Sequence, residues 1–228
     1  MKSINFDYSL LIKKLNQFQP KKLDIPELKK SAILILIYPK DNSFQILMTA
    51  RSKKLNHHRG EMSFPGGKFD PSTDVSLRDT ALRETYEEIG IYKKNIEILG
   101  TLDDFPTFTG YTIRPFIGVI KNPEKTDFKI NHNEVSDLVN IPIEFLVRDN
   151  LFTEIPLTNR SGKKIFVLSF NYIDSLTKKK FTIWGASAHI LTRFLKRIYD
   201  LKVTSDNYHR PSLNVIKEFQ NDKNIKKI

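Results

Sequence analysis

The stretch Leu82-Arg83-Glu84-Thr85-Tyr86-Glu87-Glu88-Ile89-Gly90-Ile91 decides the fold and the chemistry of this chain. It closes a helix predicted over residues 76–89, for which Ser76 is the N-cap and Gly90 the left-handed residue after the C-terminus. At 100° per residue, one side of this helix carries Leu82, Thr85, Tyr86 and Ile89. We expect this side to pack on a sheet.

The opposite side carries three acids, Glu84, Glu87 and Glu88, spaced i,i+3 and i,i+4 so that their carboxylates lie close together. Such acids repel one another, and the helix macrodipole also disfavours them near the C-terminus. A divalent cation would offset this repulsion, and Mg²⁺ or Mn²⁺ prefers oxygen ligands. Arg83, four residues before Glu87, is placed to hold that carboxylate. A solvated acidic helix face is the alternative interpretation.

The composition is that of a globular protein. Of 228 residues, 39% are hydrophobic and 11% aromatic, and there is no cysteine for a disulfide or a thiolate metal site. The lack of cysteine suits a reducing cytoplasm, which is the location we expect. The longest apolar run, residues 32–38, is far shorter than the ~20 residues of a membrane-spanning helix, and residues 1–7 hold no apolar signal core. The sequence therefore predicts no membrane partner.

The formal charge of +11, from 37 Lys and Arg against 26 Asp and Glu, indicates either anionic partners or a lysine-rich solvated surface. The lysines are spread in pairs, with one triplet at residues 178–180, and no nucleic-acid motif accompanies them. The sequence therefore favours a small phosphorylated ligand over nucleic acid. It is compatible with a monomer or a homodimer.

Helices and strands alternate irregularly, which predicts a single mixed α/β domain over residues 1–228. The core is expected over residues 32–201, with helical extensions within residues 1–30 and 202–228. The expected strands cover residues 32–38, 44–51, 96–102, 113–120, 164–170 and 181–184. The other expected helices cover residues 8–18, 143–147, 186–199 and 211–220.

The acidic stretch resembles the second half of the Nudix box: Arg-Glu, two residues, Glu-Glu, one residue and Gly. Residues 83–90 match this half without gaps. In the first half, Gly67 takes the place of the glycine, but the loop from Gly67 to Arg83 is longer than the common spacing. Asp74 stands one position before the usual acid, where this chain has Val75.

A motif upstream resembles the signature of coenzyme A diphosphatases, one branch of the Nudix family. It comprises residues 47–52 (Leu-Met-Thr-Ala-Arg-Ser) and 60–67 (Gly-Glu-Met-Ser-Phe-Pro-Gly-Gly). An arginine common in the middle of this signature is Asn56 here, so a phosphate contact made there would be lost or moved to His57, His58 or Arg59. Residues 133–135, 141–143 and 183–188 are also similar to this branch.

The resemblance implies an α/β/α sandwich in which a mixed sheet carries the Nudix loop-helix-loop. It implies hydrolysis of coenzyme A to 3′,5′-ADP and 4′-phosphopantetheine, with Mg²⁺ or Mn²⁺ held by Glu84, Glu87 and Glu88. The general base is Glu87, Glu88 or an acid from elsewhere, for which Glu134 is the candidate. A surface acid near a helix start is the other interpretation of Glu134.

Four residues are expected to contact the substrate: Arg51, Arg59, Gly66 and Gly67. The guanidinium fork suits a 3′-phosphate or a diphosphate, and glycine lets the backbone approach a ligand or a metal ion. Structural salt bridges and a tight turn are the respective alternatives. His57 and His58 are expected to be exposed, and Trp184 to belong to the core.

Two other functions stay open. The chain hydrolyses another nucleoside diphosphate derivative, such as ADP-ribose, NADH or a nucleoside triphosphate, or it is a non-catalytic module that binds a nucleotide or RNA. The clustered acids argue against the second, because a non-catalytic module has no need of them.

Overall fold

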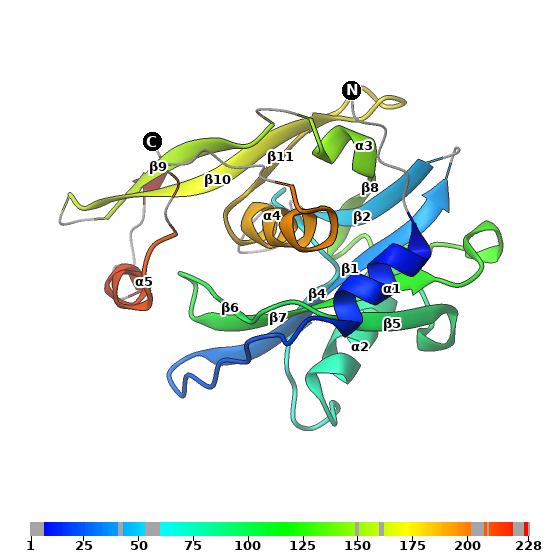
Figure 1. Ribbon diagram of the computed structural model, residues 1–228, viewed down its shortest axis with the longest axis horizontal. Coiled ribbons are helices and arrows are strands. Elements are labelled where there is room, and N and C mark those ends of the chain that lie inside the picture. The colour runs from blue at the N-terminus through cyan, green and yellow to red at the C-terminus, as the bar shows by residue number, and fades with distance from the viewer. Residues whose placement is uncertain are drawn as a thin grey trace.

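The chain forms two sheets and several helices (Figure 1). The structure is a computed structural model that describes residues 7–40, 43–52, 60–148, 151–159, 162–201, 208, 210–220 and 226–227. Asn56, His57, His58 and Arg59 lie outside the described residues. No helix in the described part of the chain is long and apolar enough to cross a membrane.

The large sheet is mixed. Its strands run in the order β3 (Met62–Ser63), β2 (Ser43–Arg51), β1 (Lys29–Lys40), β7 (Tyr111–Ile120) and β5 (Ile96–Thr101). Three further strands join it: β4 (Gly66–Lys68) pairs with β1, β6 (Phe105–Pro106) with β7, and β8 (Val135–Pro142) with β2. β1 and β7 are parallel, whereas the other pairs are antiparallel.

Different helices cover the two faces of this sheet. Leu34 and Leu36 of β1 pack with α2 (Leu77–Ile89) on one face. Ile35 and Ile37 join the core beneath α1 (Tyr8–Asn16) and α4 (Gly185–Tyr199) on the other. Because successive strand residues point to opposite faces, β1 supplies both cores and reads as one continuous apolar run. The predicted mixed α/β fold is confirmed.

The small sheet lies beyond α4. Its strands are β11 (Lys180–Trp184), β10 (Lys164–Ile173), β9 (Thr153–Thr158) and β12 (Lys226–Lys227). Phe170 and Ile183 of this sheet share a core with Phe194 of α4, so α4 lies between the two sheets (Figure 1). Other residues of the small sheet pack in a separate core with Phe219 of α5 (Leu213–Gln220). The sequence predicted β10 and β11 but not a second sheet.

Several other elements differ from the expectation. β8 and β9 were not predicted, whereas α3 (Ile143–Leu146) lies where a short helix was expected. There are also two short 3-10 helices: Lys93–Asn95 directly precedes β5, and Pro123–Lys125 follows β7. The N-terminal helix is integral to the core, because Leu11 and Leu15 of α1 are buried in it.

Candidate functional site

Local sequence fixes both ends of α2, the helix that carries the acids. The Ser76 hydroxyl caps the N-terminus by accepting from the Asp79 N–H at 3.3 Å. At the other end Gly90 has a φ of 77°, and its N–H donates to the Tyr86 carbonyl at 2.8 Å. Any side chain would be strained at this φ, so Gly90 ends the helix as predicted.

The buried side of α2 is rotated from the one that the periodicity predicted. Leu82, Thr85 and Ile89 are buried as expected, but Tyr86 is 45% exposed and Glu88 only 4% exposed. Tyr86 instead stacks on Tyr92 at the surface, with ring centroids 4.7 Å apart. The expectation that Tyr86 packs on the sheet, and that Glu88 lies on the outer side of α2, was therefore wrong.

Arg83 organises the carboxylates around it. Its Nη1 donates to Glu84 Oε1 and to Glu87 Oε2, each at 2.9 Å, so the predicted hold on Glu87 is present. Its Nε and Nη2 donate to the two oxygens of Asp74 at 2.8 and 3.0 Å. All four groups thus belong to one charge-assisted network.

Asp74 serves as the anchor of this network. Its side chain is 1% exposed, and it also accepts from Thr80 Oγ1 at 2.8 Å and from the Asp70 N–H at 3.0 Å. The hydrogen bonds from Arg83 lower the pKa of Asp74 to about 2, so it stays ionised. Thr80, which the sequence analysis did not single out, completes the anchor. The shifted loop acid therefore positions Arg83.

Gly67 and Gly66 each make room for a protein group. A Cβ on Gly67 would lie 2.3 Å from Glu84 Cδ, so the missing side chain leaves space for that carboxylate. A Cβ on Gly66 would lie 2.3 Å from the Ala32 carbonyl oxygen of β1. Close approach at Gly66 is therefore to the neighbouring strand, and at Gly67 to a candidate metal ligand.

Glu84 and Glu88 lie in surroundings that disfavour the ionised form of their carboxyl groups. Burial, with Glu84 nearby, raises the pKa of Glu88 to about 8, against the opposing effect of Arg51. Burial likewise raises the pKa of Glu84, although Arg83 counters it. Glu88 Oε2 is buried without a hydrogen-bond partner among the described residues. An unpartnered buried carboxylate oxygen is costly unless a proton or a cation satisfies it.

Glu134 is brought to the same place by backbone contacts. The Asn131 N–H donates to the Glu88 carbonyl at 3.0 Å, and the Ser52 N–H donates to the Glu134 carbonyl at 2.8 Å. The turn at residues 131–134 thus links the end of α2 to the end of β2. Its carboxylate is near enough to raise the pKa of both Glu84 and Glu88. Glu134 precedes a strand, so its interpretation as an acid near a helix start was wrong.

Arg51, at the end of β2, faces this cluster. It lowers the pKa of Glu88, and its Nε is buried without a hydrogen-bond partner among the described residues. If Arg51 contacts the substrate as predicted, it would bind a substrate group that lies next to these acids. The other predicted arginine, Arg59, lies outside the described residues.

The donor chemistry of the cluster fits a hard divalent cation. Glu84 and Glu88 offer carboxylate oxygens, one of them buried and unpartnered, beside a third acid, Glu134. Within the described ranges, no three Asp, Glu or His side chains are placed so that they could hold a metal ion by themselves. A preformed cage is not needed for Mg²⁺, because it keeps several waters and binds through one or two carboxylates plus substrate phosphates. Glu87 is turned toward Arg83 and is the more exposed of the acids.

Comparisons with known proteins agree with this arrangement. The NUDIX domain family model matches residues 28–153, more than half of the chain. A Pectobacterium atrosepticum protein described as "Uncharacterized Nudix hydrolase NudL" is 28% identical over 186 residues, covering 81% of this chain and 90% of that protein. Its counterpart in Yersinia enterocolitica is 33% identical over 153 residues, covering 67% and 73%. "Nudix hydrolase 15, mitochondrial" of Arabidopsis thaliana is 30% identical over 179 residues, covering 75% and 59%.

Proposed function

The chain belongs to the Nudix family, as a hydrolase of a nucleoside diphosphate derivative, and we propose that its substrate is coenzyme A. The products would be 3′,5′-ADP and 4′-phosphopantetheine. The observation that carries this proposal is the meeting of two motifs in space. The signature before Gly67 supplies Arg51 and the glycine pair, and both lie against the acids of α2.

Glu84 and Glu88 would hold Mg²⁺ or Mn²⁺, with Glu87, which pairs with Arg83, as a further carboxylate ligand. When bound, the ion would neutralise diphosphate oxygens and acidify a bound water. The family as a whole uses divalent ions, and the oxygen-only donor set here suits magnesium or manganese.

The chain's own residues would set the geometry of the reaction. Asp74 fixes Arg83, and Arg83 in turn fixes the rotamers of Glu84 and Glu87. Arg51 is positioned to meet a phosphate group beside Glu88. Such preorganised charges need not reorient as charge develops on the phosphoryl oxygens.

Glu134 is our candidate for the general base. Its backbone is held at the cluster by Ser52, and its charge adds to the effect of burial, which is the main cause of the raised pKa of Glu84 and of Glu88. Unlike Glu84, Glu87 and Glu88, it does not belong to α2. It can therefore approach a water from another direction than Glu84 and Glu88.

The test is substrate comparison with product analysis. The full chain with Mg²⁺ is given coenzyme A, ADP-ribose, NADH or a nucleoside triphosphate at equal concentration, in ¹⁸O-labelled water. We expect coenzyme A to be turned over fastest, with mass spectrometry finding 3′,5′-ADP and 4′-phosphopantetheine and one label on a phosphate. Near-equal rates, or a preference for ADP-ribose, would refute the substrate assignment but leave the hydrolase intact.

A further inference from the structure

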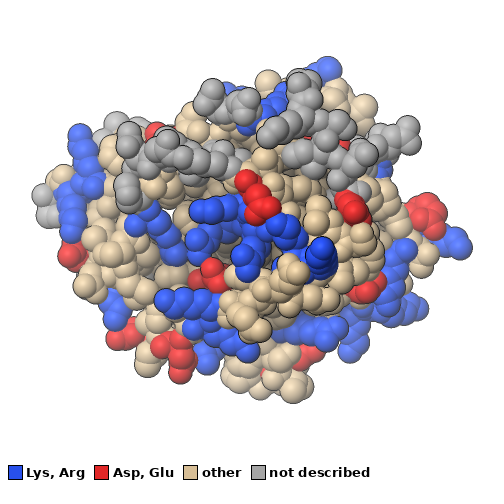
Figure 2. All heavy atoms as spheres, in the orientation of Figure 1, with Lys and Arg blue, Asp and Glu red and all other residues tan. Residues whose placement is uncertain are grey.

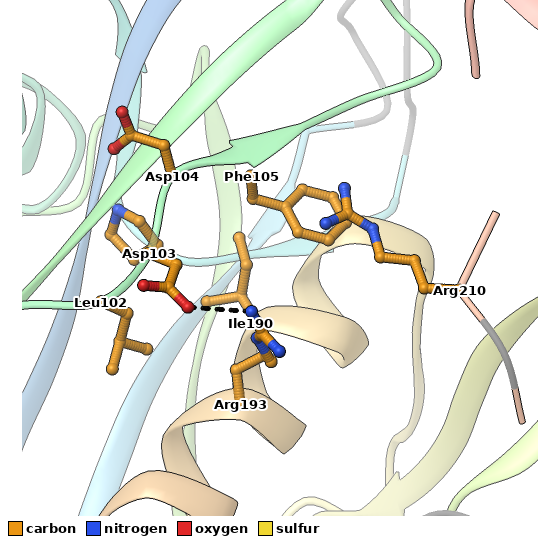
Figure 3. A pocket seen from close by; sticks show the side chains of 8 residues that line it. Leu102, Asp103, Asp104, Phe105, Ile190, Arg193 and Arg210 are labelled. Carbon is orange, nitrogen blue, oxygen red and sulfur yellow. Dashed lines mark hydrogen bonds and ion pairs between the residues drawn. The ribbon is translucent and has the colours of Figure 1, made fainter. Parts of the chain in front are cut away.

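A pocket lies on the face of the large sheet opposite α2 (Figure 3). Its lining residues are Leu102, Asp103, Asp104, Phe105, Pro115, Ile190, Arg193 and Arg210. Ile190 and Arg193 come from α4, which packs on this face, whereas the acids of the candidate active site lie on the α2 side. The pocket is therefore separate from the site described above.

The two aspartates of the pocket are already committed to other groups. Asp104 accepts from Nε and Nη2 of Arg114, each at 2.8 Å, and from the Leu23 N–H at 2.8 Å. Asp103 accepts from the Lys21 N–H at 2.7 Å and from Arg193 Nη2 at 2.9 Å. A guanidinium has five N–H donors, so Arg193 retains several for another acceptor.

Arg210 has only neutral partners among the described residues. Its Nη2 donates to the Pro106 carbonyl at 2.9 Å, and its guanidinium stacks on Phe105 at 3.9 Å from the ring centroid. Figure 3 shows Arg210 over this ring, with Arg193 reaching the pocket from α4. Burial, and then Arg193, lowers the pKa of Arg210 to about 10. Arg210 is thus a partly buried guanidinium that has no carboxylate partner among the described residues, and a second guanidinium, Arg193, lies near it, an arrangement that favours an anion between the two.

His189, next to Ile190 on α4, lies beside the same aromatic ring as Arg210. Its ring lies 4.9 Å from the Phe105 ring, centroid to centroid, and its Nε2 is buried without a hydrogen-bond partner among the described residues. Burial, and then Arg210 and Arg193, lowers the pKa of His189. In the same orientation as Figure 1, Figure 2 shows Lys and Arg side chains gathered in the middle of the visible side of the molecule.

We propose that this pocket binds a phosphate-bearing anion between Arg193 and Arg210. The guanidinium groups would donate charge-assisted hydrogen bonds to the phosphate oxygens, as their planar forks suit. Leu102, Phe105 and Ile190 give the pocket apolar walls, against which such bonds are stronger than in water. The anion is either inorganic phosphate or the phosphate of a phosphomonoester.

The test is titration calorimetry of inorganic phosphate into the full chain with a chelator present and ionic strength held constant by chloride. The chelator prevents a metal ion from drawing phosphate to the acids of α2, so this result does not depend on the proposed function. We expect one binding site, at least tenfold weaker in Arg193→Gln. Lys196→Gln, an exposed cation on the same helix that does not line the pocket, is the matched control and should change affinity by less than twofold.

Equal affinity of the Arg193→Gln and Lys196→Gln proteins would overturn the proposal, as would the absence of phosphate binding by the unmodified chain. Arg210→Gln should also bind at least tenfold more weakly if circular dichroism shows it folded; if it is not folded, Arg193→Gln decides. Methyl phosphate, titrated in parallel, distinguishes the two sources. Tighter binding than inorganic phosphate identifies a phosphomonoester, and equal or weaker binding identifies inorganic phosphate; either supports the pocket.

Discussion

Gly67 and Glu84 are packed so closely that a methyl group on Gly67 would lie 2.3 Å from the Glu84 carboxyl carbon. The contact joins the short strand β4 to the acidic helix α2, and it places a glycine directly behind a candidate metal ligand. The atoms that such a methyl group would meet are the end of the flexible Glu84 side chain, which can move aside. A substitution at Gly67 can therefore disturb the candidate metal ligand without disrupting the fold.

Gly67→Ala should therefore impair activity more than stability. The new methyl group displaces the Glu84 carboxylate, and we expect kcat to fall about 10- to 100-fold, as for a disturbed metal ligand shell, with a Tm close to the wild-type value. Gly66→Ala is the contrasting variant, since its Cβ meets the rigid backbone of β1. It should lower the Tm sharply, and equal Tm losses in both variants would contradict this distinction.

Glu87→Gln should lower kcat on the order of 100-fold or more while leaving the fold intact. The substitution keeps the shape of the side chain but removes the charge that Arg83 holds at 2.9 Å. Initial rates and circular dichroism are the measurements. Glu124→Gln, in the short 3-10 helix that follows β7, is the control for a lost acidic charge. An unchanged rate in Glu87→Gln would refute the catalytic role of this acid.

Asp74→Asn should reduce both stability and activity, because Asp74 anchors Arg83 from a nearly fully buried position. Breaking a buried ion pair by removing one partner costs about 3 kcal/mol. Freed from Asp74, Arg83 should also hold Glu84 and Glu87 less well, which lowers kcat. Denaturant unfolding and initial rates test the two effects. If the pairing were only structural, stability would fall while kcat stayed at the wild-type value.

Mg²⁺ should stabilise the chain by binding at Glu84 and Glu88. Calorimetry should detect its uptake, and the Tm should rise with Mg²⁺ concentration by mass action. Glu88→Gln should need at least tenfold more Mg²⁺ for the same uptake and the same rise in Tm. Glu124→Gln should behave as wild type. If neither Mg²⁺ nor Mn²⁺ binds, with or without substrate, the metal assignment is wrong.

The stability of the protein should fall as pH drops below about 6.5, in part because of His189. Burial, then Arg210 and Arg193, lowers the pKa of His189 from 6.5 to about 3, so the unfolded chain binds a proton there that the folded chain does not. The contribution of His189 is complete above pH 6.5 and decreases on acidification. Between pH 7 and pH 5 it should lose about 2 kcal/mol.

The His189 prediction is tested by urea unfolding at pH 7 and pH 5 in buffers without phosphate. His189→Gln cannot titrate, so its loss of stability over this interval should be smaller than that of the wild type by about the same 2 kcal/mol. The difference between the two proteins removes the contributions of other titrating groups. Identical losses would show that His189 titrates alike in the folded and the unfolded chain.

Local patterns gave much of the chain correctly. Ser76 and Gly90 fix the ends of α2 through caps that involve only near neighbours, and the spacing from Arg83 to Glu87 gave the ion pair. The predictions that were wrong concern residues whose surroundings are formed by distant parts of the chain. Tyr86 and Glu88 share one helix, yet periodicity could not tell which of them the sheet and the turn at residues 131–134 would cover.

The sequence by itself determined the family, the mixed α/β class, the acidic helix and the glycine pair, because these follow from short-range spacing. Only the tertiary structure decided that Glu88 is buried with an unpartnered oxygen, that Glu134 joins it, and that Arg193 and Arg210 share a pocket. These features bring together segments that are far apart in the chain. Burial and charge at such places are set by contacts between distant elements, which no local pattern encodes.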